Sequence, residues 1–253
     1  MGNYYHTNAI YRYLDENPHP LFKFPKGNIW ALIYGDKNTF HPKVLILAAG
    51  VKADEPLSNS YYEMYALLNQ ISHRSGVPFV TILFRTDVTQ ITEVAMAKRD
   101  GNFANIPLPE LAKKLQSFHL EMNRNPTKKA INSESSSAYM NWQRGNLGNR
   151  MIAVDIDMFK ISSQDVIERF YELKRSYFTL NQWRPFLADY NNFRVVSKLA
   201  QMSDIQFDIV YNRKTKNPCF DDPSQVRVFH VHYDQDIVIS DGRCMTIHDF
   251  MND

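Results

Sequence analysis

Acidic and amine side chains that could act together on a phosphate group lie within residues 151–178 of this 253-residue chain. Asp155 and Asp157 are two residues apart in an apolar run, so they would share one face of an extended strand. Glu172 and Lys174 have the same spacing in a second apolar run. Carboxylate oxygens are the ligands that Mg²⁺ prefers, and a lysine beside them can position water and stabilise developing negative charge. These residue types predict a metal-dependent site for phosphodiester hydrolysis.

The elements that carry these residues decide whether they meet. Residues 162–165 are turn-prone, so two extended runs could pair as neighbouring strands and bring Asp157, Glu172 and Lys174 together. The alternative is a helix, because Ser162 and Asp165 have the spacing of a capping box and the apolar residues after them fit a helical stripe. In a helix, Glu172 and Lys174 would be ordinary solvated charges on different faces.

A known family shows this pattern. Asp157 followed by hydrophobic residues, then Glu172-Leu173-Lys174 in an apolar segment, resembles the signature of the PD-(D/E)XK nuclease superfamily. The resemblance covers about residues 150–214 and implies an α/β fold with a mixed central sheet flanked by helices, a restriction-endonuclease-like core. It implies that Asp157 and Glu172 are metal ligands for Mg²⁺, which Mn²⁺ can replace, and that Lys174 is the catalytic lysine. Asp155 is a competing acid and a candidate third ligand.

The function implied by this resemblance is a Mg²⁺-dependent endodeoxyribonuclease of the type II restriction kind. Since the chain has no helicase or P-loop pattern, we expect a stand-alone enzyme that acts on double-stranded DNA, with a homodimer suited to symmetric cleavage. The alternative is a catalytically inactive nuclease-like module that binds DNA or another protein. Metal dependence separates the two, because a binding module keeps its affinity without metal.

Composition favours one soluble domain spanning residues 1–253, since 44% of the residues are hydrophobic and can form a substantial core. The longest apolar run, residues 44–49, is far shorter than the roughly 20 residues needed to span a bilayer. The N-terminus lacks the pattern of a secretory signal, and two cysteines are too few for a disulfide scaffold. We therefore expect a cytoplasmic protein without a membrane segment.

Positive charge is concentrated in one segment, although the net charge is only +2. Residues 98–150 hold nine Lys and Arg against four acids, and they read as a basic polar insertion whose second half is a loop. An excess of this kind suits contacts to phosphate groups, but a solvated insertion without a partner explains it equally well. The candidate DNA-binding residues are Lys128, Lys129, Arg144 and Arg175.

Other candidates have stronger structural explanations. Glu63, on a predicted helix at residues 58–74, could be a further acid of the site, but its spacing from Ser60 predicts a capping box. Gln182 could contact substrate or water, but it has the same spacing from Thr179, ahead of a helix predicted to begin near residue 185. His230, His232 and His248 lack the partners that would complete a zinc site, so we expect structural histidines. The other predicted elements are a hairpin at 28–51, helices at 8–18 and 108–122, strands at 79–84 and 205–211, and one or two strands over 226–240.

Overall fold

A computed structural model describes residues 8–53, 55–88, 90–98, 102–123 and 137–253. These residues form two compact units. The first contains Pro25–Asp155, and the second contains Ile156–Asp253 together with the described part of Tyr5–Phe24. Composition favours one domain, whereas the division between the two units falls between Asp155 and Ile156, inside the stretch predicted to be a single strand.

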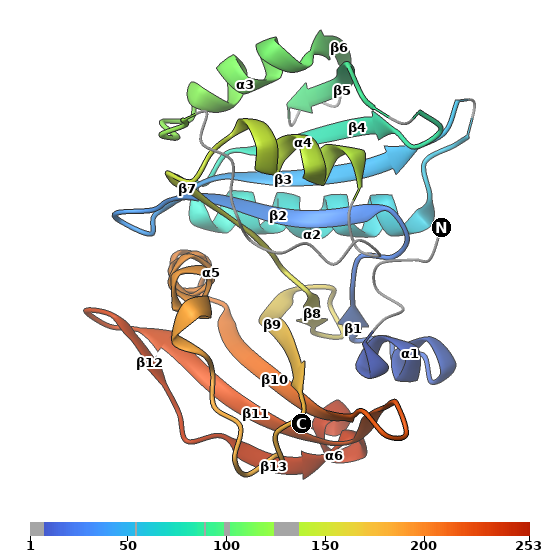
Figure 1. Cartoon of the computed structure of the whole chain (residues 1–253), viewed down its shortest axis with the longest axis vertical. Helices are drawn as coiled ribbons and strands as arrows, with labels where there is room; N and C mark the ends of the chain where they lie inside the picture. The colour runs from blue at the N-terminus through green and yellow to red at the C-terminus, as the bar shows by residue number, and fades with distance from the viewer. Residues whose placement is uncertain (1–7, 54, 89, 99–101, 124–136) are drawn as a thin grey trace. The chain divides into compact units, whose positions relative to one another are not determined.

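The first unit is built on a six-stranded mixed sheet in the order β6-β5-β4-β3-β2-β7 (Figure 1). Its strands are β2 (Ile29–Asp36), β3 (Pro42–Val51), β4 (Phe79–Arg85), β5 (Glu93–Lys98), β6 (Ala104–Pro107) and β7 (Met151–Asp155), and its helices are α2 (Asn59–Ser75), α3 (Leu108–Gln116) and α4 (Ala138–Asn146). β3 and β4 are parallel because α2 crosses between them, and the other neighbours are antiparallel. The predicted hairpin, helix and strand between residues 28 and 84 are confirmed.

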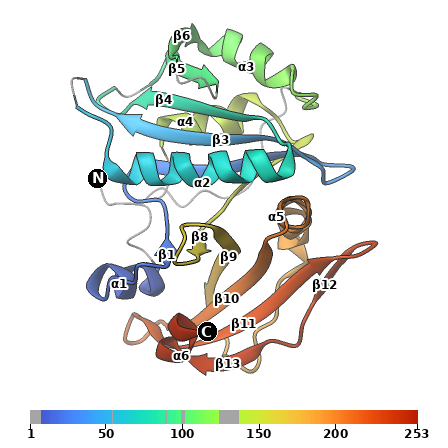
Figure 2. The same cartoon turned by 180° about the vertical axis from the view of Figure 1, so that it is seen from behind.

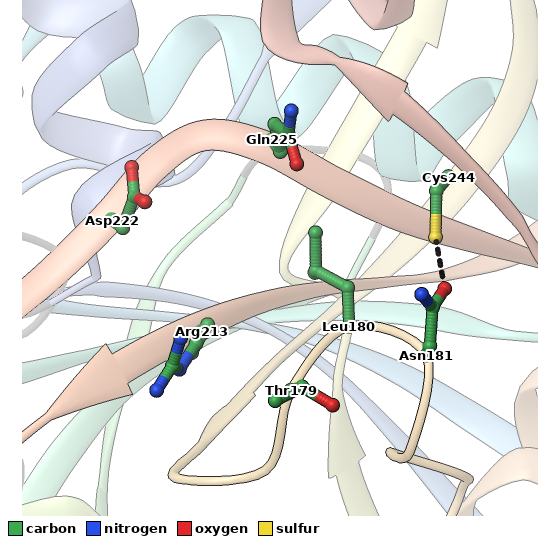
Figure 3. Close-up of a pocket in the computed structure, with 7 residues that line it drawn as sticks. All are labelled: Thr179, Leu180, Asn181, Arg213, Asp222, Gln225 and Cys244. Atoms are coloured by element: carbon green, nitrogen blue, oxygen red, sulfur yellow. Dashed lines mark hydrogen bonds between the residues drawn. The ribbon is translucent and has the colours of Figure 1, made fainter.

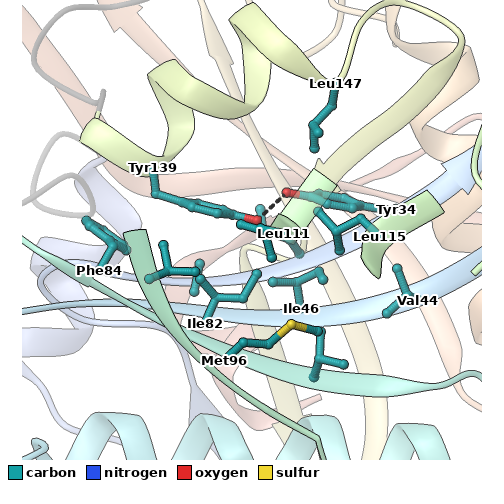
Figure 4. Packing of buried hydrophobic residues seen from close by; sticks show 14 of the residues in the cluster. Tyr34, Val44, Ile46, Ile82, Phe84, Met96, Leu111, Leu115, Tyr139 and Leu147 are labelled. Carbon is teal, nitrogen blue, oxygen red and sulfur yellow. Dashed lines mark hydrogen bonds between the residues drawn. The ribbon is translucent and has the colours of Figure 1, made fainter. Parts of the chain in front are cut away.

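Helices cover both faces of this sheet, with α2 on one face and α4 on the other (Figures 1 and 2). Burial on both faces explains why every residue of β2 is buried and why β2 and β3 read as nearly continuous apolar runs. On the α4 face, Tyr34 and Tyr139 lie hydroxyl to hydroxyl at 2.8 Å within the apolar cluster (Figure 4). Tyr34 also donates to Gln143 at 2.6 Å, so the buried hydroxyl groups are hydrogen-bonded.

The second unit holds a seven-stranded mixed sheet in the order β1-β8-β9-β10-β11-β12, with β13 also pairing β11. Its strands are β1 (Phe22–Lys23), β8 (Met158–Ile161), β9 (Ile167–Ser176), β10 (Gln206–Thr215), β11 (Phe220–Tyr233), β12 (Ile237–Ile239) and β13 (Arg243–Thr246). Its helices are α1 (Ala9–Glu16), η3 (Leu187–Asp189), α5 (Tyr190–Ser203) and α6 (Ile247–Asn252). β8 and β9 are antiparallel, whereas β9 and β10 are parallel and joined through α5.

The two sheets share one sequence of connections. In the first unit, the antiparallel pair β2–β3 is followed by α2, by β4 parallel to β3, and by antiparallel β5. In the second, β8–β9 is followed by α5, by parallel β10 and by antiparallel β11. Strand β9 carries Glu172 and Lys174, whereas its counterpart β3 reads PKVLILAAGV and has no acid. The acid and lysine pattern therefore occurs in one of two units of the same topology.

The predicted strand across residues 151–159 is wrong, because the chain forms two strands there. β7 pairs with β2 in the first unit, and β8 pairs with β9 in the second, with buried Ile156 and then Asp157 between them. Alternation along the sequence continues through the break, so periodicity could not reveal it. The mixed α/β class is confirmed. Among the described residues, no helix is long and apolar enough to cross a membrane.

Candidate active site

A β-hairpin in the second unit positions the central residues of the predicted site. The turn is closed by the Ser162 amide, which donates to the Val166 carbonyl at 2.8 Å, and Asp165 adopts a left-handed backbone with φ 58°. β8 and β9 then pair with Met158 opposite Tyr171. The extended prediction for the run that holds Glu172 and Lys174 is confirmed over the helical alternative, because β9 covers Ile167–Ser176 and the two side chains share a strand face.

Asp157 is fixed immediately before β8 by contacts from two sides. Its Oδ2 atom accepts a hydrogen bond from the Leu173 amide at 2.7 Å, across the hairpin. Its backbone carbonyl accepts a hydrogen bond from the Tyr11 hydroxyl of α1 at 3.1 Å. A carboxylate that accepts an amide hydrogen bond is stabilised in its charged form. The hairpin therefore places the Asp157 carboxylate beside the Glu172-Leu173-Lys174 segment, as predicted.

Lys174 is the centre of a cluster of acids. Its Nζ atom lies 2.7 Å from Glu172 Oε1 and 3.6 Å from Asp189 Oδ2. The ammonium also lies over the Phe193 ring of α5, at 5.6 Å from the ring centroid. The Lys174 side chain is 23% exposed and Glu172 is buried, so this charge cluster lies at the edge of the core with access to solvent.

Asp189 was missed in the sequence analysis. It ends η3, directly before α5, and the α5 crossover returns it to the strand that carries Lys174. The sequence offers only an acid ahead of an amphipathic helix, which is a common pattern with no specific meaning. Only the three-dimensional arrangement assigns it to the cluster.

The neighbouring acids determine the protonation of Lys174. Burial lowers the pKa of a lysine, but Glu172 and Asp189 beside it, with Asp157 further away, raise the pKa of Lys174 well above its ordinary value. The side chain is therefore an ammonium at neutral pH. In this state it can stabilise negative charge but cannot accept a proton from water.

Asp155 does not share a strand with Asp157, contrary to the prediction. It is the last residue of β7 in the first unit, where it pairs with Leu32 of β2. Glu63 also belongs to the first unit, as an exposed residue of α2. The predicted capping box of Ser60 and Glu63 is wrong, because Ser58 caps α2 by accepting from the Tyr61 amide at 3.3 Å.

The predicted DNA-binding residues have different structural positions. Arg144, predicted to lie in a loop, is in the last turn of helix α4 in the first unit. Lys128 and Lys129 lie outside the described residues. Arg175 forms an ion pair with Asp221 at 2.5 Å in the second unit, so its charge is already partly satisfied within the sheet.

Gln182 belongs to a turn rather than to the start of a helix. The Thr179 hydroxyl donates to Gln182 Oε1 at 2.8 Å, but α5 begins only at Tyr190, so the predicted helix cap is wrong. His230 has a hydrogen-bonded role, since its Nδ1 lies 2.7 Å from Oδ1 of buried Asp208. In the described parts of the chain, no group of three or more His, Cys, Asp or Glu side chains is arranged to hold a metal ion.

No protein-family model and no curated protein matches the chain. Among solved structures, the C-terminal domain of the sex pheromone staph-cAM373 precursor from Staphylococcus aureus is 11% identical, with 78% of this chain and 63% of that chain covered and a TM-score of 0.16. The sex pheromone precursor from Lactobacillus salivarius is 10% identical, with 78% and 61% covered and a TM-score of 0.16. This chain thus spans less than two thirds of the length of either. At these TM-scores the similarity supports no inference about fold or function.

Proposed function

We propose that the second unit carries a metal-dependent phosphodiesterase site and that the protein is an endonuclease acting on DNA. One observation carries this proposal: Asp157, Glu172 and Lys174, which are separated in sequence by a turn, lie together on one hairpin with Asp189 beside them. Carboxylates supply oxygen ligands for a hard cation, and the ammonium supplies a positive charge for the phosphate. This combination suits phosphodiester hydrolysis.

The donor set fits Mg²⁺ or Mn²⁺. Mg²⁺ is usually held by one or two protein carboxylates, several waters and the phosphates of the substrate, so it needs no complete cage of side chains. Asp157 and Glu172 would supply those carboxylates. A bound Mg²⁺ would screen the phosphate charge and increase the acidity of a bound water.

The residues of the chain have separate tasks in this proposal. The Leu173 amide orients the Asp157 carboxylate, and Glu172 and Asp189 hold Lys174 as an ammonium between them. There the ammonium would stabilise the negative charge that develops on the phosphate during attack by water. As long as Lys174 keeps its proton, another group or the solvent must take the proton of that water.

The order of the elements also supports the proposal. After Lys174, the chain forms helix α5 and then strand β10 parallel to β9, which is the order that the resemblance to the PD-(D/E)XK superfamily implies. The restriction-endonuclease-like core, the restriction-type activity, the double-stranded substrate and the homodimer remain proposals that rest on this resemblance.

The test compares the wild-type chain with Asp157→Asn, Glu172→Gln and Lys174→Ala on plasmid, single-stranded DNA, branched DNA and RNA, with Mg²⁺, with Mn²⁺ and with chelator. We expect metal-dependent cleavage by the wild type and at least a hundredfold loss in each variant. Glu168→Gln is the matched control, because Glu168 is an exposed acid on the same strand β9.

Each outcome discriminates between the alternatives. Cleavage that is lost with chelator and in the three variants, but kept in Glu168→Gln, supports the site. If all substrates remain intact while wild type and variants bind DNA equally well with and without metal, the catalytic proposal fails and an inactive binding module replaces it.

A further inference from the structure

The segment that follows β9 exposes large apolar side chains next to the candidate site. Phe178, Phe186 and Leu187 are 52%, 47% and 81% exposed. The rings of Phe178 and Phe186 are neighbours, with centroids 6.4 Å apart. Leu187 begins the short helix η3 that ends at Asp189 of the acid cluster. We call these three side chains the apolar platform.

Basic side chains lie at the ends of strands β9 and β10, where Arg213 and Lys214 pair with Asp222 and Asp221 of β11. β9 and β10 run side by side with Arg213 next to Ser176, so the next residues on both strands are also close. Lys214 and Lys216 both lie over the exposed Tyr177 ring, each 4.8 Å from its centroid. These cation–π contacts hold two ammonium groups at the strand ends, where they can meet phosphates.

A polar pocket of about 290 Å³ is partly lined by residues 179–181, which lie between Phe178 and Phe186 of the apolar platform in sequence (Figure 3). Asn181 and Gln225 bring amide groups that can both donate and accept hydrogen bonds. Arg213 lies two residues beyond Tyr211, which pairs with Lys174, so Arg213 and Lys174 are on the same face of the sheet. That step is about 7 Å along a strand. The pocket is lined by Thr179, Leu180, Asn181, Arg213, Asp222, Gln225 and Cys244.

The loop of residues 179–181, which lines part of the pocket, is held by hydrogen bonds from a buried arginine. The Arg227 guanidinium is buried and donates from Nη1 to the carbonyls of Leu180 and Asn181, at 3.0 and 2.9 Å. It also donates to the carbonyl of Asp241. The pocket loop is therefore fixed in place by a buried side chain, as expected for a preformed binding site.

We propose that the apolar platform and the pocket bind an unpaired nucleotide of single-stranded nucleic acid, next to the phosphate that the acid cluster acts on. This inference rests on the proposed function, and for its substrate it favours single-stranded nucleic acid over the double-stranded DNA that the resemblance implies. An unpaired base exposes a flat face that can stack on Phe178 or Phe186 and an edge that amide side chains can bind. Bases inside a continuous duplex expose no such face, while Lys214 and Lys216 would contact the backbone phosphates.

The test measures binding by fluorescence anisotropy in chelator, so that no substrate is cleaved. The full chain is titrated against a labelled single strand, the matching blunt duplex, and the same duplex with a single-stranded overhang. We expect the single strand and the overhang to bind about tenfold more tightly than the blunt duplex, as one stacked base would produce. An abasic site moved along the overhang should weaken binding at one defined position.

Variants test the platform directly. Phe178→Ala should lower affinity for the single strand about tenfold and remove the position-dependent effect of the abasic site. Phe178→Trp should keep the wild-type affinity and the effect of the abasic site. Tyr62→Ala, an exposed aromatic of α2 in the first unit, is the matched control and should bind like the wild type. Because Phe178 is half exposed, its replacement should leave the circular dichroism spectrum unchanged.

The outcomes separate this inference from the proposed function. Equal binding of single strand and blunt duplex, or full affinity in Phe178→Ala, would overturn the inference, even if metal-dependent cleavage of duplex is found. Preference for the single strand without any cleavage would support the binding site for an unpaired nucleotide and refute the nuclease activity.

Discussion

Replacing Lys174 by methionine should destabilise the second unit, because it removes the shared cation of three acids. Glu172 and Asp189 lie within 2.7 and 3.6 Å of the ammonium, and the Asp157 carboxylate contributes from further away. Removing one partner of a buried ion pair lowers the free energy of unfolding by about 3–5 kcal/mol. Since the Lys174 side chain is 23% exposed, solvent screens part of this interaction. We expect the lower end of that range, a loss of about 3 kcal/mol at pH 7.

The pH dependence follows from the direction of the pKa shift. The acids raise the pKa of Lys174 in the folded state. Its contribution is therefore fully present below the unfolded lysine pKa of about 10.4, and it is lost only as the pH rises through the folded pKa. Wild-type stability should not change on this account between neutral pH and about pH 9. The difference in free energy of unfolding between the wild type and Lys174→Met should become smaller at acidic pH, because protonation of the neighbouring carboxylates removes the repulsion between them.

Urea unfolding followed by tryptophan fluorescence measures the effect, since buried Trp183 stacks on Tyr211 within the second unit. Glu172→Gln completes a double-mutant cycle with Lys174→Met. The free energy of unfolding lost in the variant that carries both substitutions should be about 2 kcal/mol smaller than the sum of the two single losses. Lys160→Met on strand β8 is the matched control. If Lys174→Met unfolds at the wild-type urea concentration, or if the two losses simply add, the acids do not depend on the lysine and this account of the cluster is wrong.

Three further predictions test the surrounding fold. Burial raises the pKa of Asp208, so ionisation of its carboxyl group opposes folding. The free energy of unfolding of the wild type should therefore fall as the pH rises above about 4, the pKa of an unfolded Asp. Asp208→Asn should lack this decline. Thermal melts from acidic to neutral pH would show the difference, and parallel curves would contradict it. Tyr34→Phe removes a buried hydroxyl group bonded to Tyr139 and should cost about 1–3 kcal/mol in chemical denaturation, whereas an unchanged midpoint would refute that role. Gly242→Ala should lower the melting temperature, because φ is +76° and a Cβ would lie 2.6 Å from the Phe229 ring; a melting temperature equal to that of the wild type would show that the turn relaxes.

Local signals in the sequence were sufficient for much of the fold. The turn-prone residues 162–165 and the alternation after them predicted the β8–β9 pair, and the apolar runs at 28–51 predicted β2 and β3. These signals work because side-chain period and turn preference are local properties of the chain. The same local reasoning brought Asp157, Glu172 and Lys174 onto one hairpin.

Local signals were insufficient where long-range pairing decides. Residues 151–159 alternate without interruption, yet β7 joins one sheet and β8 the other, which separates Asp155 from Asp157. Arg144 was predicted to lie in a loop because its neighbourhood is polar and glycine-containing, but the burial of Tyr139 and Gln143 stabilises helix α4. Tertiary packing overrides weak local preference in such segments.

The sequence by itself determined which residue types could do chemistry, and it left a pair of strands and a helix open as the elements that carry Glu172 and Lys174. The tertiary structure decided which acids lie beside Lys174. It placed Asp189 beside Lys174 through the α5 crossover and placed Asp155 in the first unit. It also gathered the apolar platform and the polar pocket at the ends of β9 and β10. The physical reason is that a site is defined by distances in space, and those distances are set by strand pairing and helix packing between residues that are far apart in the chain.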